Sequence, residues 1–361
     1  PSGGLNMAAV ASKTCFFASQ CRRLLQQPAT NAKSWAHHAR RTCANTSIAE
    51  PYRSVEKIDI EALFISQKVQ NLLQRLTGFD LEKVFAPIPG PLNTPRYKFL
   101  TDEQLDQELQ DSQRRARRKL QMPPVLRERK PCEKVLAKDP EIQGFGNSTH
   151  VFTDISYGYK DRERLIVVRE PEGLLRTATW EERERMLQTY FTNKEKSFYM
   201  PKMFEPQHLQ DVLDKQWYRF VLDRACIQFE PDDANYIRVT HATYDHIDAN
   251  RGFHELRSTR HFGPMAFYLT VMGKIDNLLI DMLQREMIED TGHLLRLFYH
   301  IHPPSDSAQV DENTDNIELV KFYMRSDSKK RSHLELALQT CLEIRSSREE
   351  VDKDLASARG Q

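Results

Sequence analysis

Acidic residues are missing from the first 49 positions of this chain, and Glu50 is the first of them. The same stretch is rich in Ser and Thr and carries six basic residues, which are Lys13, Arg22, Arg23, Lys33, Arg40 and Arg41. A long run that is basic, rich in Ser and Thr and free of acidic residues is typical of a mitochondrial transit peptide. We therefore expect residues 1–49 to be a leader to the mitochondrial matrix, cut just after Arg40–Arg41, with Met7 a candidate start. A basic tail that binds nucleic acid or a membrane directly is the alternative.

Long apolar runs are also missing, since none approaches the ~20 residues that a membrane-spanning helix needs. We therefore expect no membrane span. The whole chain has 52 basic and 51 acidic residues, and removal of residues 1–49 leaves 46 and 51, a net charge of −5. Hydrophobic residues make up 39% of the chain, below the usual share for a globular domain, and charged residues 29%. This composition favours an extended, helix-rich body with much surface facing solvent or partners.

Cysteine and glycine are too scarce for several classes of site. Only Cys132, Cys226 and Cys341 follow the leader, and no Cys-x-x-Cys pair exists, which argues against a disulfide framework and a zinc knuckle. The thirteen glycines form no phosphate-cradling loop, and the nucleophile elbow and the His-Glu-x-x-His motif are absent. We therefore expect no catalytic residue, no cofactor and no metal, although a matrix enzyme with a cryptic site stays open as a rival.

Helical periodicity of apolar residues dominates what the chain does contain. Capping boxes, in which a Thr and the residue three positions later cap one another, occur at Thr101 with Gln104 and at Thr179 with Glu182. Four prolines between residues 86 and 96 instead indicate an extended linker. The predicted helices span residues 56–76, 101–119, a segment from 179 onward, 206–229, 274–299 and 333–350.

Two segments, 151–157 and 164–169, read as strands because they are short, rich in β-branched residues and joined by a polar turn. They predict a hairpin, followed by a turn at residues 171–173. A lone hairpin is marginally stable, so we expect it to pack on helices or to pair with a third strand, for which residues 236–240 are a candidate. The predicted fold class is mainly α with a small central β-hairpin or sheet (α+β).

The predicted parts of the chain follow from these elements, and no fixed-period repeat suggests a solenoid. They are a leader at 1–49, N-terminal helices with a Pro-rich linker at 50–130, a central α+β region at 131–240 with the hairpin at 151–170, a C-terminal helical region at 241–350 and a tail at 351–361.

The densest charge cluster holds five cations in six residues, Arg114, Arg115, Arg117, Arg118 and Lys119. Guanidinium groups at this density suit phosphates, because arginine contacts them with two parallel hydrogen bonds and displaced counterions add affinity. The alternative is a solvated helix end, where cations also favour the helix dipole. Because Arg127, Arg129 and Lys130 follow closely, we favour an RNA contact.

A second polar cluster occupies residues 257–263, where Arg257 and Arg260 stand with two hydroxyls and a histidine. We expect a helix to start directly after it, at residues 265–272. Such donors at a helix start bind phosphate readily, whereas the alternative is a polar loop whose Ser or Thr only caps the helix. Other histidines, at 241, 246, 300 and 302, match no metal-binding spacing, and we expect them to be structural or exposed.

Seven short sequence blocks resemble segments of one known family. They occur in the same order as in that family and cover roughly residues 57–345. The blocks are 122–126, 151–157, 166–171, 180–183, 228–232, 256–260 and 274–281 (Met-Pro-Pro-Val-Leu, Val-Phe-Thr-Asp-Ile-Ser-Tyr, Ile-Val-Val-Arg-Glu-Pro, Trp-Glu-Glu-Arg, Gln-Phe-Glu-Pro-Asp, Leu-Arg-Ser-Thr-Arg and Lys-Ile-Asp-Asn-Leu-Leu-Ile-Asp). The family is mitochondrial ribosomal small-subunit protein number twenty-two. The resemblance implies a component of the animal mitochondrial ribosome that contacts other small-subunit proteins and some small-subunit rRNA, and it brings no catalytic motif.

The expected function is therefore that of a structural constituent of the mitochondrial small ribosomal subunit that supports mitochondrial translation. Its expected partners are other small-subunit proteins and rRNA, with no small-molecule substrate. Besides the enzyme with a cryptic site, the rival is a matrix RNA-binding regulator that acts off the ribosome. Such a regulator should bind isolated RNA with a steep dependence on salt.

Overall fold

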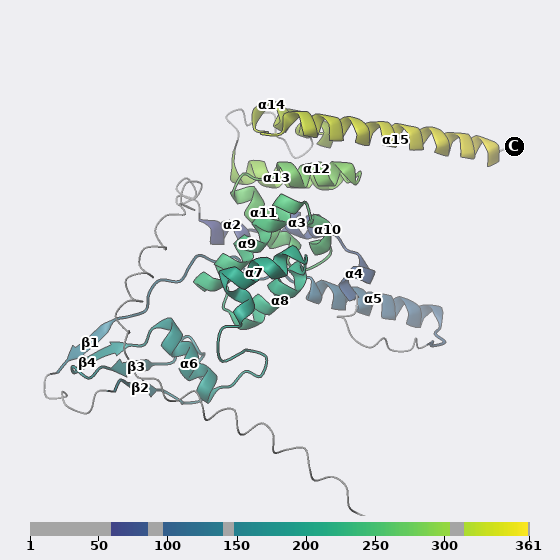
Figure 1. Ribbon diagram of the computed structural model, residues 1–361. Coiled ribbons are helices and arrows are strands. Elements are labelled where there is room, and N and C mark those ends of the chain that lie inside the picture. Colours follow the sequence, from purple (N-terminus) through teal and green to yellow (C-terminus); the bar gives the residue numbers. More distant parts are fainter. Residues whose placement is uncertain (1–58, 86–96, 140–147, 304–313, 360–361) are drawn as a thin grey trace, which may run out of the picture. The chain divides into compact units, whose positions relative to one another are not determined.

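The computed structural model describes residues 59–85, 97–139, 148–303 and 314–359 (Figure 1). The expected leader at 1–49 and the Pro-rich linker at 86–96 lie outside these ranges. Residues Ser54–Gln361 group into one compact unit by their contacts, and this grouping does not test the predicted division into regions. Among the described helices, none is both long and apolar enough to cross a membrane.

The N-terminal part of the described chain is helical, as expected. It contains α2 (Ile60–Ile65), α3 (Gln67–Thr77), α4 (Leu81–Phe85) and α5 (Asp102–Lys119). The helix predicted over 56–76 is broken at Ser66, whose hydroxyl accepts from the backbone N–H of Val69 and caps α3. Both halves of the capping box at Thr101 and Gln104 are formed, which confirms the predicted start of α5.

A four-stranded antiparallel sheet follows, in the order β1-β4-β3-β2. Its strands are β1 (Val135–Lys138), β2 (His150–Thr153), β3 (Ile166–Arg169) and β4 (Leu174–Thr177). The predicted hairpin is confirmed as β2 and β3, with Val151 opposite Val168. Ile166 and Val168 are fully buried and, with Ala178, pack against Met186 and Leu187 of α6 (Trp180–Tyr190), which begins at the predicted capping box of Thr179.

The prediction of a further strand at residues 236–240 is wrong. These residues lie inside α9 (Ala234–Asn250), where Asp233 accepts from the N–H of Asn235 and caps the helix. Tyr236, Val239 and Ile247 are buried at helical spacing, so the apolar residues serve one helix face. The extra strands are β1 and β4, which are only four residues long and carry no alternating pattern of burial.

The remaining helices build the main hydrophobic core. They are α7 (Pro206–Asp214), preceded by the 3-10 turn η2 (Lys202–Phe204), and α8 (Tyr218–Gln228), α10 (Phe253–Leu256), α11 (Phe262–Val271), α12 (Asp276–Gln284), α13 (Ile288–Ile301), α14 (Asn316–Ser326) and α15 (Arg331–Arg359). Every residue of α11 is buried, and this helix contacts α3, α9 and α13. An apolar surface all round is expected of a helix at the centre of a core.

Two helices predicted as continuous are each divided into two. The segment 206–229 breaks at Gln216 (φ 59°) between α7 and α8, and 274–299 breaks at Glu286 (φ 60°) between α12 and α13. Non-glycine residues rarely adopt positive φ, so composition gives no warning of either break. The last predicted helix, 333–350, is longer than expected and continues to Arg359.

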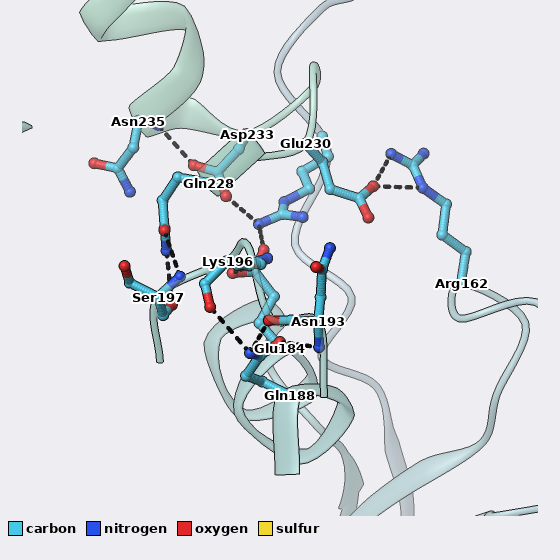
Figure 2. A network of polar contacts seen from close by, with 11 residues as sticks. Arg162, Glu184, Gln188, Asn193, Lys196, Ser197, Gln228, Glu230, Asp233 and Asn235 are labelled. Atoms are coloured by element: carbon cyan, nitrogen blue, oxygen red, sulfur yellow. Dashed lines mark hydrogen bonds and ion pairs between the residues drawn. The ribbon is translucent and has the colours of Figure 1, made fainter. Parts of the chain in front are cut away.

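Buried charges join the sheet region to the start of α9 (Figure 2). The guanidinium of Arg129 pairs with Asp233, which caps α9, and lies 2.9 Å from Oε1 of Glu184 on α6. It also stacks over the Trp180 ring, 4.6 Å from the centroid. Nearby, Arg162 donates from Nε to Glu230 at 2.8 Å, with its side chain 49% exposed. The network is thus buried at Arg129 and open to solvent at Arg162.

Candidate nucleic-acid interface

The five cations of the predicted cluster lie at the C-terminal end of α5, and all five are exposed. Arg114 pairs with Asp111, and Arg115 lies 3.6 Å from Glu108, so the carboxylates of the same helix hold these two. Within the described residues, Arg117 and Arg118 have no acidic partner. Lys119 places Nζ 4.8 Å from the centroid of the Phe85 ring on α4. Two arginines of the five are therefore free to contact an anion.

The second predicted cluster forms the loop between α10 and α11, and its arginines pair with acids of the core. Arg257 forms an ion pair with Asp290 on α13. Arg260 donates from Nε and Nη2 to Oδ1 of Asp223 at 3.0 and 2.6 Å. Nε2 of the buried His261 lies 2.9 Å from the same oxygen. Asp223 thus anchors the loop to α8.

Burial and these contacts shift the pKa values of both titrating groups. Desolvation lowers the pKa of His261, although the carboxylate of Asp223 opposes the shift. Burial alone would raise the pKa of Asp223, but the hydrogen bond and charge of His261, together with Arg260, lower it. The carboxylate is therefore ionised at neutral pH and orients the guanidinium of Arg260.

The two hydroxyls of this loop are used to build it. Ser258 has φ 60°, donates its N–H to the carbonyl oxygen of Thr77 at 2.8 Å, and accepts the N–H of Asp80 with its hydroxyl oxygen at 3.2 Å. The hydroxyl of Thr259 donates to the carbonyl oxygen of Leu256 at 2.6 Å. The contacts of Ser258 tie the loop to the segment after α3, so its hydroxyl serves the fold, and Arg257 and Arg260 are the cations of this loop.

The structure brings part of both clusters to one hollow of about 520 Å³. Arg118 and Lys119 from α5 line it together with Arg260 from the loop and Arg219 from α8. Asp223 is the one carboxylate among its lining residues, so four cations outweigh a single acid there. Guanidinium and ammonium groups converging in this way favour a phosphate-bearing ligand.

A second hollow, of about 1010 Å³, flanks the same end of α5. It is lined by Arg75 of α3 and by Arg117 and Arg118. Arg114, Arg115 and Arg257 line neither hollow. Sequence reasoning missed Arg75 and Arg219, because neither belongs to a run of charges in the sequence and the fold alone places them beside the end of α5. One local signal existed, since Arg219 and Asp223 are spaced to face each other on a helix, 3.7 Å apart.

The other histidines singled out in the sequence have contacts within the protein or face solvent. His241 stacks on Tyr268 with ring centroids 4.4 Å apart. His246 places Nδ1 3.1 Å from the hydroxyl of Tyr218. Nε2 of His302 lies 2.9 Å from the carbonyl oxygen of Thr270, and His300 is exposed.

His241 should make the fold sensitive to mild acid. Desolvation lowers its pKa from 6.5 to about 4, although Asp245 opposes the shift. As pH falls from 6.5 to 4, the unfolded chain binds a proton that the folded chain resists, so the free energy of unfolding should drop by about 2–3 kcal/mol. His241→Phe keeps a ring against Tyr268 and removes the proton site. Between pH 7 and pH 4.5, urea unfolding should therefore show a smaller drop in the free energy of unfolding for this variant than for the wild type. Equal drops in the two proteins would show that His241 is not the group responsible.

Comparison with known proteins gives a consistent match. The model of a family described as mitochondrial 28S ribosomal protein S22 matches residues 62–303. Small ribosomal subunit protein mS22 of Mus musculus is 42% identical over 283 residues, which cover 78% of this chain and 79% of that protein. The protein of the same name in Bos taurus is 42% identical over 278 residues, 76% of this chain and 77% of that protein. The range matched by the family model includes α5 and the loop at 257–263, and it ends before α14.

Proposed function

Because the chain belongs to the mitochondrial 28S ribosomal protein S22 family, we propose that it is a structural constituent of the mitochondrial small ribosomal subunit. The family match over residues 62–303 is the observation that carries this conclusion. The protein then works in the mitochondrial matrix, supports mitochondrial translation and has a structural role without catalysis. In this proposal residues 1–49 are a transit peptide. The mature protein then consists of the regions predicted at 50–130, 131–240, 241–350 and 351–361.

Small-subunit rRNA is one partner in this proposal, and the end of α5 is its contact. Arg117, Arg118 and Lys119 line the hollows beside α5 and are exposed, which supports phosphate contacts there. Arg260, from the loop between α10 and α11, also lines the smaller of these two hollows. Arg114, Arg115 and Arg257 belong to the same proposed surface, although each already has an acidic neighbour.

Other small-subunit proteins are the second class of partner. Leu105 and Leu109 stand one helical turn apart on α5 and are 49% and 47% exposed. In the sheet region, Phe152 on β2 is 57% exposed, and Leu165, directly before β3, is 60% exposed. Exposed apolar side chains that lie next to one another, as Leu105 and Leu109 do, are typical of surfaces that contact other proteins.

Sedimentation of a mitochondrial lysate with dissociated ribosomal subunits tests this function. We expect the protein to migrate with the small-subunit rRNA and to stay with it when the salt concentration is moderately raised. Migration as a free species at the top of the gradient would overturn the proposal and favour a free RNA-binding regulator or an enzyme. Binding of the free protein to isolated RNA, with a steep salt slope, would then identify the regulator.

A further inference from the structure

A third group of cations lies at the start of α15, where the sequence analysis predicted no site. It lines a hollow of about 400 Å³ formed by Arg251, Lys329, Lys330, Arg331, Ser332 and His333. Four of these six side chains are permanently cationic, and no carboxylate is among them. All six are exposed. We name them the α15 basic cluster.

Two distant segments are held together to form this cluster. Arg251 follows the last residue of α9 and has φ 54°. The turn before α15 is fixed on α12, because the N–H of Lys329 donates to Oδ2 of Asp276 at 3.0 Å and Nζ of Lys330 donates to Oδ1 of Asn277 at 2.6 Å. Oδ1 of the buried Asp276 accepts from the hydroxyl of Tyr323 at 2.7 Å. The cluster therefore has a defined backbone position on the core.

The charges of this cluster are largely uncompensated. In the parts of the chain that the structure describes, Arg251, Lys329 and Arg331 form no ion pair. Two carboxylates add negative charge near the turn without pairing with these three cations: Asp276 accepts from Tyr323 and from the backbone of Lys329, and Asp248 interacts electrostatically with Lys330. This arrangement differs from Arg257 and Arg260, whose charges are balanced by Asp290 and Asp223.

The cations lie at the start of α15, where the helix dipole makes positive charge unfavourable unless an anion is bound. α15 is 29 residues long and has no acid in its first turn, where the dipole and the free N–H groups favour negative charge. α5 has the opposite polarity, with Asp102 and Glu103 at its start and the cations at its end. A solvated helix end therefore accounts for the charges of α5 but not for those of α15. An anion at the start of α15 would be favoured by the side chains and the helix together.

We propose that the α15 basic cluster binds backbone phosphates of the ribosomal RNA. The inference rests on the proposed function, because it takes the RNA of the small subunit as the ligand. It adds a contact outside the residues matched by the family model, apart from Arg251. Phosphate contacts of this kind position a protein on RNA without reading its sequence.

Intact small subunits that carry tagged full-length protein provide the test. The variant Lys329→Gln/Arg331→Gln removes one lysine and one arginine from the cluster. Lys321→Gln/Arg325→Gln is the matched control, since it removes the same two residue types from exposed positions of α14 outside the hollow. Release from the subunit is measured over a series of salt washes, and RNA–protein crosslinking with mass spectrometry identifies the peptide that touches RNA.

We expect a crosslink from the peptide containing residues 329–333 to rRNA, and release of the cluster variant at roughly half the salt concentration that releases the wild type and the control. The free variant should unfold at the same temperature as the wild type or at a slightly higher one, because the two cations that it lacks oppose the dipole of α15. Equal release of both variants, or a crosslink from this peptide to a protein instead of RNA, would overturn the inference alone. A wild-type protein that does not sediment with the subunit would overturn the proposed function itself.

Discussion

Arg129→Met is expected to lower the free energy of unfolding by about 3 kcal/mol. The side chains of Arg129 and Asp233 are 12% and 9% exposed, so the substitution leaves a carboxylate buried without its counter-charge. Breaking a buried ion pair by removing one partner typically costs about 3–5 kcal/mol. We expect the lower end, because Asp233 still accepts from the N–H of Asn235 and Glu184 keeps Lys196 at 3.6 Å. Urea unfolding followed by circular dichroism measures the change.

Arg162→Met is the matched control for this prediction. Arg162 also pairs with two acids, and its pair with Glu230 is exposed on both sides, at 49% and 39%, where ion pairs contribute about 0–1 kcal/mol. Asp232 is only 11% exposed, but water can replace the exposed guanidinium beside it, so we expect a loss of about 1 kcal/mol. The double variant Arg129→Met/Asp233→Asn should recover part of the loss, since it removes the unpaired charge. Equal losses for Arg129→Met and Arg162→Met would show that burial does not decide the strength of this network.

Local signals predicted the parts of the fold that depend on neighbouring residues. Both capping boxes form as expected, because Thr101 and Thr179 each need only a residue three positions ahead. The β2–β3 hairpin also follows from a local β-branched pattern, although its strands are shorter than predicted and residues 154–165 connect them. The breaks at Gln216 and Glu286 could not be predicted, since packing of the helices on either side imposes a positive φ on ordinary residues.

Candidate sites show the same division between local and distant effects. A run of cations identified the end of α5, but nothing in the sequence connects Arg118 with Arg219 or Arg260, which the fold places around one hollow. In the α15 basic cluster, Lys329, Lys330 and Arg331 are adjacent in the sequence, but Arg251 stands far from them along the chain and joins them only in the fold. Charge density along a sequence therefore finds sites on one helix, whereas sites assembled from several elements require the fold.

Reversing four charges on α5 should have the largest effect on assembly. The variant Arg114→Glu/Arg115→Glu/Arg117→Glu/Arg118→Glu is expected to weaken incorporation into the small subunit on the order of 100-fold. A hydrogen bond between charged groups contributes about 1.5–3 kcal/mol, so the loss of two phosphate contacts accounts for this factor before repulsion is added. All four arginines are exposed, and Ala116, which packs inward, is unchanged. Quantitative blotting of gradient fractions over a range of salt concentrations measures the effect.

Two smaller variants locate the effect along the helix. Arg117→Gln/Arg118→Gln removes the arginines that line the hollows and have no acidic partner among the described residues. Arg114→Gln/Arg115→Gln removes as many charges from the arginines that Asp111 and Glu108 already balance. If α5 contacts RNA through its free arginines, the first pair should lower the salt concentration of release and the second should leave it nearly unchanged. Normal incorporation of the fourfold variant would remove α5 from the RNA interface, and equal effects of the two pairs would point to the overall charge of the helix instead.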